Sequence, residues 1–116
     1  MQHHNKNRKF GLKTDQRRAL IRSLSIALIE NGKIKTTEAK AKEIRSIVEK
    51  MVTKAKTADL NSRRQLVSKI GPMAANLLIT KIAPEFMERK GGYTRITKLM
   101  TRRTDAARMA LVEFVK

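Results

Sequence analysis

A chain of 116 residues, 41% of them hydrophobic, has the size of one domain and enough apolar surface for a core. Its 27 Lys and Arg and 10 Asp and Glu give a formal net charge of +17. Because so much like charge destabilises a free domain by self-repulsion, it indicates a polyanionic partner. The absence of cysteine excludes disulfides, cysteine nucleophiles and cysteine-ligated metals, and it fits a reducing compartment.

Neither a membrane span nor a secretion signal is expected. No apolar run approaches the roughly 20 residues that cross a bilayer. The polar N-terminus lacks the apolar stretch of a signal peptide. We therefore expect a cytoplasmic protein, or a protein of an organellar matrix that has already been processed.

The first segment, residues 1–13, is polar and basic. Such a segment cannot bury enough apolar surface to offset the entropy of ordering, about 1–2 kcal/mol per residue. We predict an extended basic arm that is disordered without its partner. Residues 14–116 show no internal repeat and no long linker, so we expect them to form a single domain.

A first helix is predicted over residues 15–31. Thr14 suits the N-cap position, and apolar side chains recur at the spacing of one helical face. Gly32 fits the left-handed position that follows many helices. The next residues, 33–36, are interpreted as a short extended link.

Three further helices are predicted in the middle of the chain. Thr37 can cap a helix over 38–56, and the apolar stripe of that helix is too short for a convincing coiled coil, so it should pack within its own domain. Helices over 62–70 and 73–82 follow, separated by Gly71-Pro72.

The last part of the chain is predicted to form two strands, over 94–102 and 109–115. The second strand alternates, and its apolar face of Ala110, Val112 and Phe114 should face the helices. Strands this close in sequence pair antiparallel most simply. The predicted fold class is α+β, two-layer, with several helices packed on a small C-terminal antiparallel sheet.

The sequence offers no catalytic or metal-binding constellation. His3 and His4 lack a third strong ligand at a plausible spacing, and neither a P-loop nor a dinucleotide-binding glycine pattern is present. With no other histidine and no cysteine, no nucleophile–base pair is visible. We therefore expect no enzyme, no metal and no cofactor.

Two features favour folded RNA over sequence-specific reading of duplex DNA. The helices around Gly71-Pro72 could form a helix-turn-helix, but the basic side chains lie on the first helix, and the second is apolar. Aromatic residues make up only 3%, too few for a base-stacking platform. Recognition would then depend on phosphates and shape.

The segment 89–95 is the densest candidate binding site. Gly91 and Gly92 would let backbone amides approach a phosphate, flanking cations would clamp it, and Tyr93 could stack on an exposed base. The alternative is an ordinary turn into a strand. The candidate RNA-binding residues are His3, His4, Lys6, Arg8, Lys9, Lys13, Arg17, Arg18, Arg22, Lys35, Arg63, Arg64, Arg89, Lys90, Gly91, Gly92, Tyr93, Arg95 and Lys98.

Five short stretches form a recognisable series: IKTT (34–37), KAKE (40–43), EKMVTKAK (49–56), GGYTRI (91–96) and DAARMALVE (105–113). Together with Asn61, Arg63 and Arg64, they resemble the bacterial large-subunit ribosomal protein L17 family, in that family's order and spacing, over nearly the whole chain. The chain departs from the family at QHHN (2–5), where a Met-x-His-Arg-like run is usual, and it matches weakly over 65–82.

The resemblance implies an α+β protein that lies on large-subunit ribosomal RNA with its arm in the RNA. It also implies a position beside neighbouring large-subunit ribosomal proteins near the nascent-chain exit side. We expect no membrane partner and no homo-oligomer. A nucleoid-type DNA-compacting protein is the alternative, supported only by charge. A membrane-surface protein would need basic helices with large exposed apolar faces.

Overall fold

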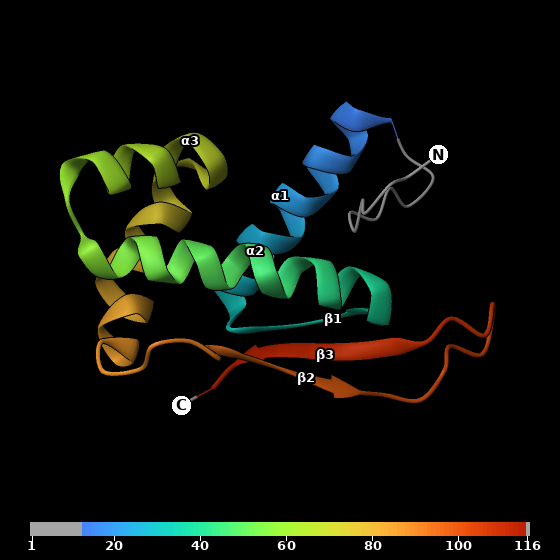
Figure 1. The fold of residues 1–116 in the computed structure, drawn as a ribbon. Helices are drawn as coiled ribbons and strands as arrows, with labels where there is room; N and C mark the ends of the chain where they lie inside the picture. The colour runs from blue at the N-terminus through green and yellow to red at the C-terminus, as the bar shows by residue number, and fades with distance from the viewer. Residues whose placement is uncertain (1–12, 116) are drawn as a thin grey trace, which may run out of the picture.

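The computed structural model of the chain describes residues 13–115, so the predicted arm, except Lys13, lies outside the described residues. Helices cover one face of a three-stranded sheet: α2 lies along the sheet, and α1 and α3 pack on the far side of α2 (Figure 1). The predicted α+β class is confirmed. In chain order the elements are α1 (Thr14–Asn31), β1 (Lys33–Thr37), α2 (Glu38–Thr57), α3 (Leu60–Leu77), the π-helical η1 (Leu78–Ile82), the 3-10 helix η2 (Ala83–Phe86), β2 (Thr94–Lys98) and β3 (Met109–Phe114).

The sheet is antiparallel, in the order β1-β3-β2. The predicted pairing of the two C-terminal strands is confirmed. The segment interpreted as a link, 33–36, is instead most of β1, a third strand on the other edge of β3. In the register, Lys35 lies opposite Leu111, and Leu111 lies opposite Thr97. Five residues with two exposed lysines are typical of a short edge strand, and their pairing partner is about 75 residues away in the sequence, so local pattern does not reveal it.

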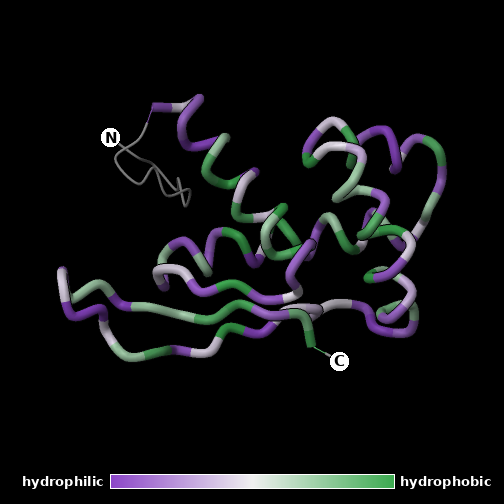
Figure 2. The backbone as a smooth tube through the Cα atoms, turned by 180° about the vertical axis from the view of Figure 1, so that it is seen from behind, coloured by the Kyte–Doolittle hydropathy of each residue, from purple (hydrophilic) through white to green (hydrophobic). Residues whose placement is uncertain are grey.

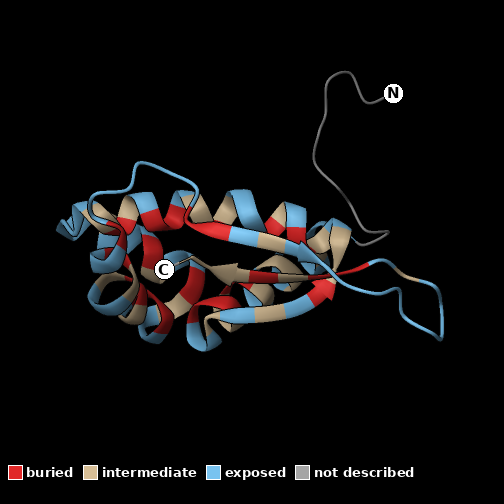
Figure 3. Cartoon of the chain, turned by 90° about the horizontal axis from the view of Figure 1, so that it is seen from below, coloured by how far each residue is buried: buried red, intermediate tan, exposed pale blue. Residues whose placement is uncertain are grey.

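β2 ends earlier than predicted, at Lys98. Beyond it the chain continues as a narrow hairpin loop, in which the Leu99 N–H donates to the Met109 carbonyl and the Arg102 N–H donates to the Ala107 carbonyl, both at 2.9 Å. Figure 3 shows this loop extending past the helices. Because no helix lies beneath it, nothing there buries one face of a longer strand.

The ends of α1 and α2 agree closely with the predicted caps. Gly32 has a φ of 80° and donates its N–H to a carbonyl one turn back, as expected for a left-handed helix end. The Thr37 hydroxyl accepts the Lys40 N–H at 3.4 Å, so the predicted cap of α2 is confirmed. At the start of α1 the prediction is one residue off, because Lys13 and not Thr14 occupies the N-cap position.

α3 consists of two helical segments that meet at Gly71. Its φ of 83° and ψ of 166° belong to a region that is open essentially to glycine alone, and Pro72 begins the second segment. The predicted break is therefore confirmed. The first segment begins earlier than predicted because Asp59 caps it, accepting the Ser62 N–H at 2.7 Å. The second continues into η1 and η2 instead of ending as an α-helix at residue 82.

The core lies between α2 and the sheet and among the three helices. Hydrophobic and hydrophilic stretches alternate along the helices, as amphipathic packing requires (Figure 2). Ala110 and Val112 are buried and Phe114 is half-buried, so the apolar face predicted for β3 is confirmed. The predicted stripe of α2 is buried throughout, at Ala41, Ile44, Val48, Met51, Val52 and Ala55.

One stretch of the described chain, Leu60–Phe86, is long and apolar enough to cross a membrane by length and composition alone, because it contains an 18-residue window with a mean hydropathy of 1.2. The sequence expectation that no run approaches this length therefore needs correction. The stretch is broken at Gly71, and Leu66, Leu78 and Phe86 lie in the core. Its apolar character is accounted for by packing within the domain.

Candidate nucleic-acid interface

The predicted binding residues are distributed over several parts of the molecule. His3, His4, Lys6, Arg8 and Lys9 precede the first described residue, and their role stays a prediction. The remaining residues lie on α1, at the start of α3, at the glycine turn between η2 and β2, and on the sheet.

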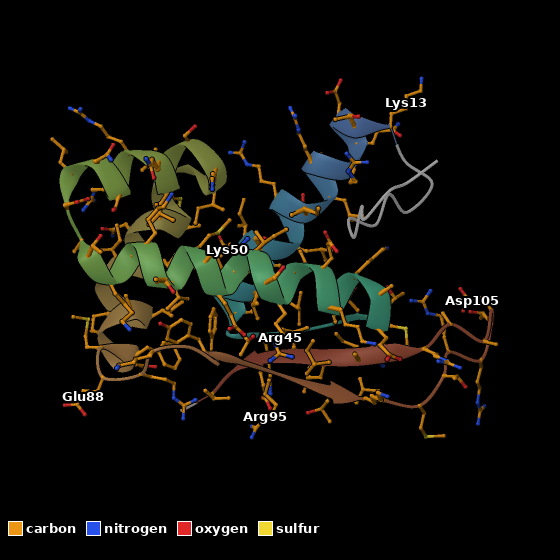
Figure 4. The ribbon with its side chains drawn as sticks, viewed as in Figure 1. Lys13, Arg45, Lys50, Glu88, Arg95 and Asp105 are labelled. Carbon is orange, nitrogen blue, oxygen red and sulfur yellow. The ribbon has the colours of Figure 1, made fainter. Side chains whose placement is uncertain are left out.

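The first half of α1 stands away from the rest of the domain, with Lys13 at its tip (Figures 1 and 4). Arg18 and Arg22 are exposed, and Arg17 is half-buried. Within residues 13–115, no carboxylate forms an ion pair with any of these three arginines. The charges of these arginines are therefore available to an external anion.

Arg18 and Arg22 line a groove that runs between the three helices, which we call the three-helix groove. Its other cationic residues are Lys50 and Lys54 of α2 and Lys69 of α3. Sequence reasoning did not include these three lysines among the candidate binding residues. Lys50 and Lys54 are four residues apart and lie off the apolar stripe of α2, which is a usable signal. The orientation of that face toward α1 and α3 is known only from the tertiary structure.

The glycine turn is held in place by side chains around it. Arg89 Nη1 donates to the Gly92 carbonyl at 3.0 Å, and Lys56 Nζ donates to the Arg89 carbonyl. Gly92 has a φ of 63°, and no atom lies within 4 Å of where a Cβ would stand at Gly91 or Gly92. Lys90 beside them is exposed. The backbone of the turn is therefore open to close approach, while part of the Arg89 guanidinium is used internally.

Tyr93 does not offer its ring to a base, and this part of the sequence prediction is wrong. The residue is only 1% exposed, and its ring packs on Phe86 at a centroid distance of 5.2 Å. Its hydroxyl accepts hydrogen bonds from Thr53 at 3.4 Å and Lys56 at 3.1 Å. The hydrogen bond from Thr53, and to a smaller extent the one from Lys56, holds the pKa of the Tyr93 hydroxyl below its ordinary value. An aromatic ring that can both fill the core and satisfy its hydroxyl is more stable inside than exposed.

The predicted residues of the sheet lie on different faces. The register places Lys35 and Arg95 on the face away from the helices, and Arg95 projects there in Figure 4. Arg95 pairs with Glu113 at 2.9 Å. Lys98 shares the helix-facing side of the sheet and approaches Glu38 at 3.8 Å. A single flat surface cannot contact all three cations.

The two arginines at the start of α3 are exposed. Arg63 Nη2 donates to Asn76 Oδ1 at 3.3 Å, so this side chain connects the two segments of α3. Arg64 forms no ion pair with a carboxylate in the described part of the chain. Of the two, Arg64 is therefore the one whose charge is fully available to an outside partner.

The main chemical feature of the described surface is its unpaired positive charge, which attracts anionic partners. Between residues 13 and 115, no cluster of three or more His, Cys, Asp or Glu could hold a metal ion. Every buried side-chain polar atom in that range has a hydrogen-bond partner, so none points unpaired into a cavity. The fold and this surface together define a class: small, strongly basic α+β domains suited to a polyanionic partner.

Comparisons with known proteins make that class specific. The model of the family described as Ribosomal protein L17 matches residues 20–115. The chain is 51% identical to the large ribosomal subunit protein bL17 of Nautilia profundicola over 120 residues, covering 99% of this chain and 98% of that protein. It is 47% identical over 116 residues to the bL17 of Campylobacter jejuni subsp. jejuni, covering 99% of each. It is 46% identical over 116 residues to that of Campylobacter hominis, covering 99% of this chain and 98% of that protein. The chain belongs to the ribosomal protein L17 family, and the resemblance seen in the sequence is confirmed.

Proposed function

We propose that this chain is a structural constituent of the large subunit of a bacterial ribosome, bound to folded large-subunit ribosomal RNA through phosphate and shape contacts. The observation that carries the proposal is the near-complete match, 99% of this chain and 98% of the relative, to a protein named as part of the large ribosomal subunit. The chain supports translation without catalysis.

The distribution of charge supports phosphate contacts. The formal charge is +17, and many cations of the described surface have no carboxylate partner within residues 13–115. Tyr93 and Phe86 are buried and Phe114 is half-buried, so these rings are not presented to bases. Contacts to phosphates and to the shape of folded RNA are the mode that such a surface allows.

The same proposal extends to location and partners. The chain acts in the cytoplasm, within the ribosome, as a single copy beside other large-subunit proteins near the nascent-chain exit side. The relatives named above are bacterial, which gives no support to an organellar matrix.

Co-sedimentation tests the proposal directly. The chain should remain with large subunits after a wash in high salt, because specific contacts persist where nonspecific charge attraction is screened. In a competition assay, folded large-subunit ribosomal RNA should displace the chain from random duplex DNA. Equal affinity for the two nucleic acids would favour the nucleoid-type alternative.

A further inference from the structure

We propose that the three-helix groove holds a sugar–phosphate backbone of the bound RNA. This inference deepens the proposed function, on which it rests, and it assigns Lys50, Lys54 and Lys69 to the interface in addition to Arg18 and Arg22. The cations come from three separate helices, so the site exists only in the folded domain.

The groove is continuous across the helical layer. One hollow is lined by residues of all three helices and a second by residues of α2 and α3, and the two hollows share Ile47, Met51 and Lys69. Figure 4 shows Lys50 on α2, in the space between α1 and α3. A chain-like ligand can therefore extend from the cations of α1 to those of α3.

The cations of the groove are not neutralised by the protein itself. In the described residues, none of the five forms an ion pair, and no carboxylate lines either hollow. Other cations of α2 are paired: Lys42 with Glu38 at 3.1 Å and Arg45 with Glu49 at 3.2 Å. On one face of α2 the cations are therefore paired with carboxylates, and on the face toward the groove they are not. An external anion would neutralise the unpaired positive charge of the groove face.

Acidic residues stay at the margin of this site. Asp15 and Glu43 lie about one helical turn before the lining residues of α1 and α2 and are not among those lining residues. Glu43 already has an interaction of its own. Neither carboxylate therefore lies among the cations that line the groove.

The apolar floor favours a nucleic-acid backbone over an isolated phosphate. Ile21, Ile47 and Met51 lie between the cations, and ribose presents apolar faces between successive phosphates. Arg22 reaches from α1 toward the kink of α3, since a Cβ at Gly71 would stand 3.7 Å from its Nη2 atom. The guanidinium is thus placed at the junction of two helices, where it can bind a phosphate with two donors.

The groove is poorly equipped to read base identity. Ser25 is an uncharged polar side chain among the lining residues, and its hydroxyl donates to the Ile21 carbonyl at 2.8 Å. No Asn, Gln or aromatic side chain lines the two hollows. The contacts would position the RNA strand without specifying its sequence.

Binding of the full chain to refolded large-subunit ribosomal RNA, measured as log affinity against log salt concentration, tests the groove. Lys50→Gln, Lys54→Gln and Lys69→Gln are combined in one variant, because Gln is nearly as good a helix former as Lys. We expect the salt slope to flatten by about two to three units and the affinity at physiological salt to fall about 10- to 100-fold. The matched control combines Lys33→Gln, Lys40→Gln and Lys81→Gln, which removes the same charge outside the groove and should change the slope by less than about one unit.

Lysine acetylation of the wild-type chain gives a second measurement that does not depend on a variant. Bound RNA should slow acetylation of Lys50, Lys54 and Lys69 more than that of Lys33 and Lys81. If the groove and control variants lose affinity equally, or if the groove lysines stay as reactive as in the free chain, the groove assignment is overturned while RNA binding stands. If the wild-type chain does not prefer ribosomal RNA to duplex DNA, the proposed function fails and the groove assignment fails with it.

Discussion

At the residue scale, Lys56 connects three parts of the fold. Its ammonium group donates to the Tyr93 hydroxyl at 3.1 Å and to the Arg89 carbonyl, and it lies 5.2 Å from the centroid of the Tyr93 ring. α2, the glycine turn and the start of β2 are thereby joined by one side chain. The conformation of the turn thus depends on the buried hydroxyl of Tyr93 as well as on its glycines.

Replacement of Tyr93 by Phe isolates the contribution of that hydroxyl. The ring is kept, but Thr53 and Lys56 lose an acceptor at a buried position, so the free energy of unfolding should fall by about 1–2 kcal/mol. Urea denaturation measures the change. The control Ser46→Ala removes an exposed hydroxyl bonded to a carbonyl of its own helix and should stay within about 0.5 kcal/mol of wild type. Equal stabilities of Tyr93→Phe and wild type would contradict the role given to the hydroxyl.

Glu38, a carboxylate at the start of α2, should make the stability of the fold depend on pH. The hydrogen bond from Lys42, aided by the charges of Lys42, Lys98 and Arg108, lowers the pKa of Glu38 from its ordinary value. A lowered folded-state pKa stabilises the fold above the unfolded-state pKa, and this contribution is lost as the pH falls through the folded-state pKa. Glu38→Gln should therefore be less stable than wild type at pH 7, and the difference should shrink as the pH falls below the ordinary pKa of the carboxyl and vanish only below the lowered folded-state pKa. Urea denaturation across that pH range measures it, and a constant difference would contradict the assignment.

At the element scale, the kink of α3 allows one apolar stretch to serve two parts of the core. Leu66 and Ile70 precede Gly71, and Ala74 and Leu78 follow it, and all four are buried. If α3 were straight, Ala74 and Leu78 would point away from the part of the core in which Leu66 and Ile70 are buried. The non-helical backbone of Gly71 is what redirects the chain.

Replacement of Gly71 by Ala should therefore cost stability through the backbone alone. The new Cβ would meet Arg22 at 3.7 Å, an ordinary contact, but the φ of 83° with a ψ of 166° is strained for any side chain. We expect a loss of about 1–3 kcal/mol in the free energy of unfolding, measured by urea denaturation. Gly91→Ala is the matched control, because its Cβ would meet no atom within 4 Å and its φ lies outside the left-handed range. Similar stabilities for the two variants would show that the kink is not strained by a side chain.

At the scale of the whole molecule, basic residues occupy more than one side of the domain. Lys50 lies on α2 between α1 and α3, whereas Arg95 projects from the opposite, outer face of the sheet (Figure 4). On the outer face Arg95 is balanced by Glu113, while the arginines of α1 have no carboxylate partner among the described residues. These α1 arginines, unlike Arg95, therefore carry charge that no carboxylate of residues 13–115 balances.

The arginines of α1 should contribute strongly to RNA affinity. Replacing Arg17, Arg18 and Arg22 together by Gln should flatten the plot of log affinity against log salt by up to about three contacts' worth, with little loss of helix. Circular dichroism would check the helix content. A control variant in which Lys42, Arg45 and Arg102 become Gln removes the same charge from ion-paired positions and should have the smaller effect. An unchanged slope in the α1 variant would place the RNA on another face.

Local signals in the sequence were sufficient for much of the fold. The glycine after α1, the Thr37 cap, the break at Gly71-Pro72 and the buried stripe of α2 each depend on residues a few positions apart, and the structure has each of them where predicted. The strongly basic character could also be inferred from the composition, and the family from the order of short sequence stretches. The comparisons confirm the family.

The tertiary structure decided whatever depends on residues distant in the sequence. β1 is a strand because β3 pairs with it, Tyr93 is buried because Phe86, Thr53 and Lys56 surround it, and the lysines of α2 and α3 meet the arginines of α1 only once the helices pack. Caps, breaks and stripes are short-range effects of backbone geometry and helical spacing. Strand pairing and the convergence of charges are set by contacts across the domain, which no single segment of sequence contains.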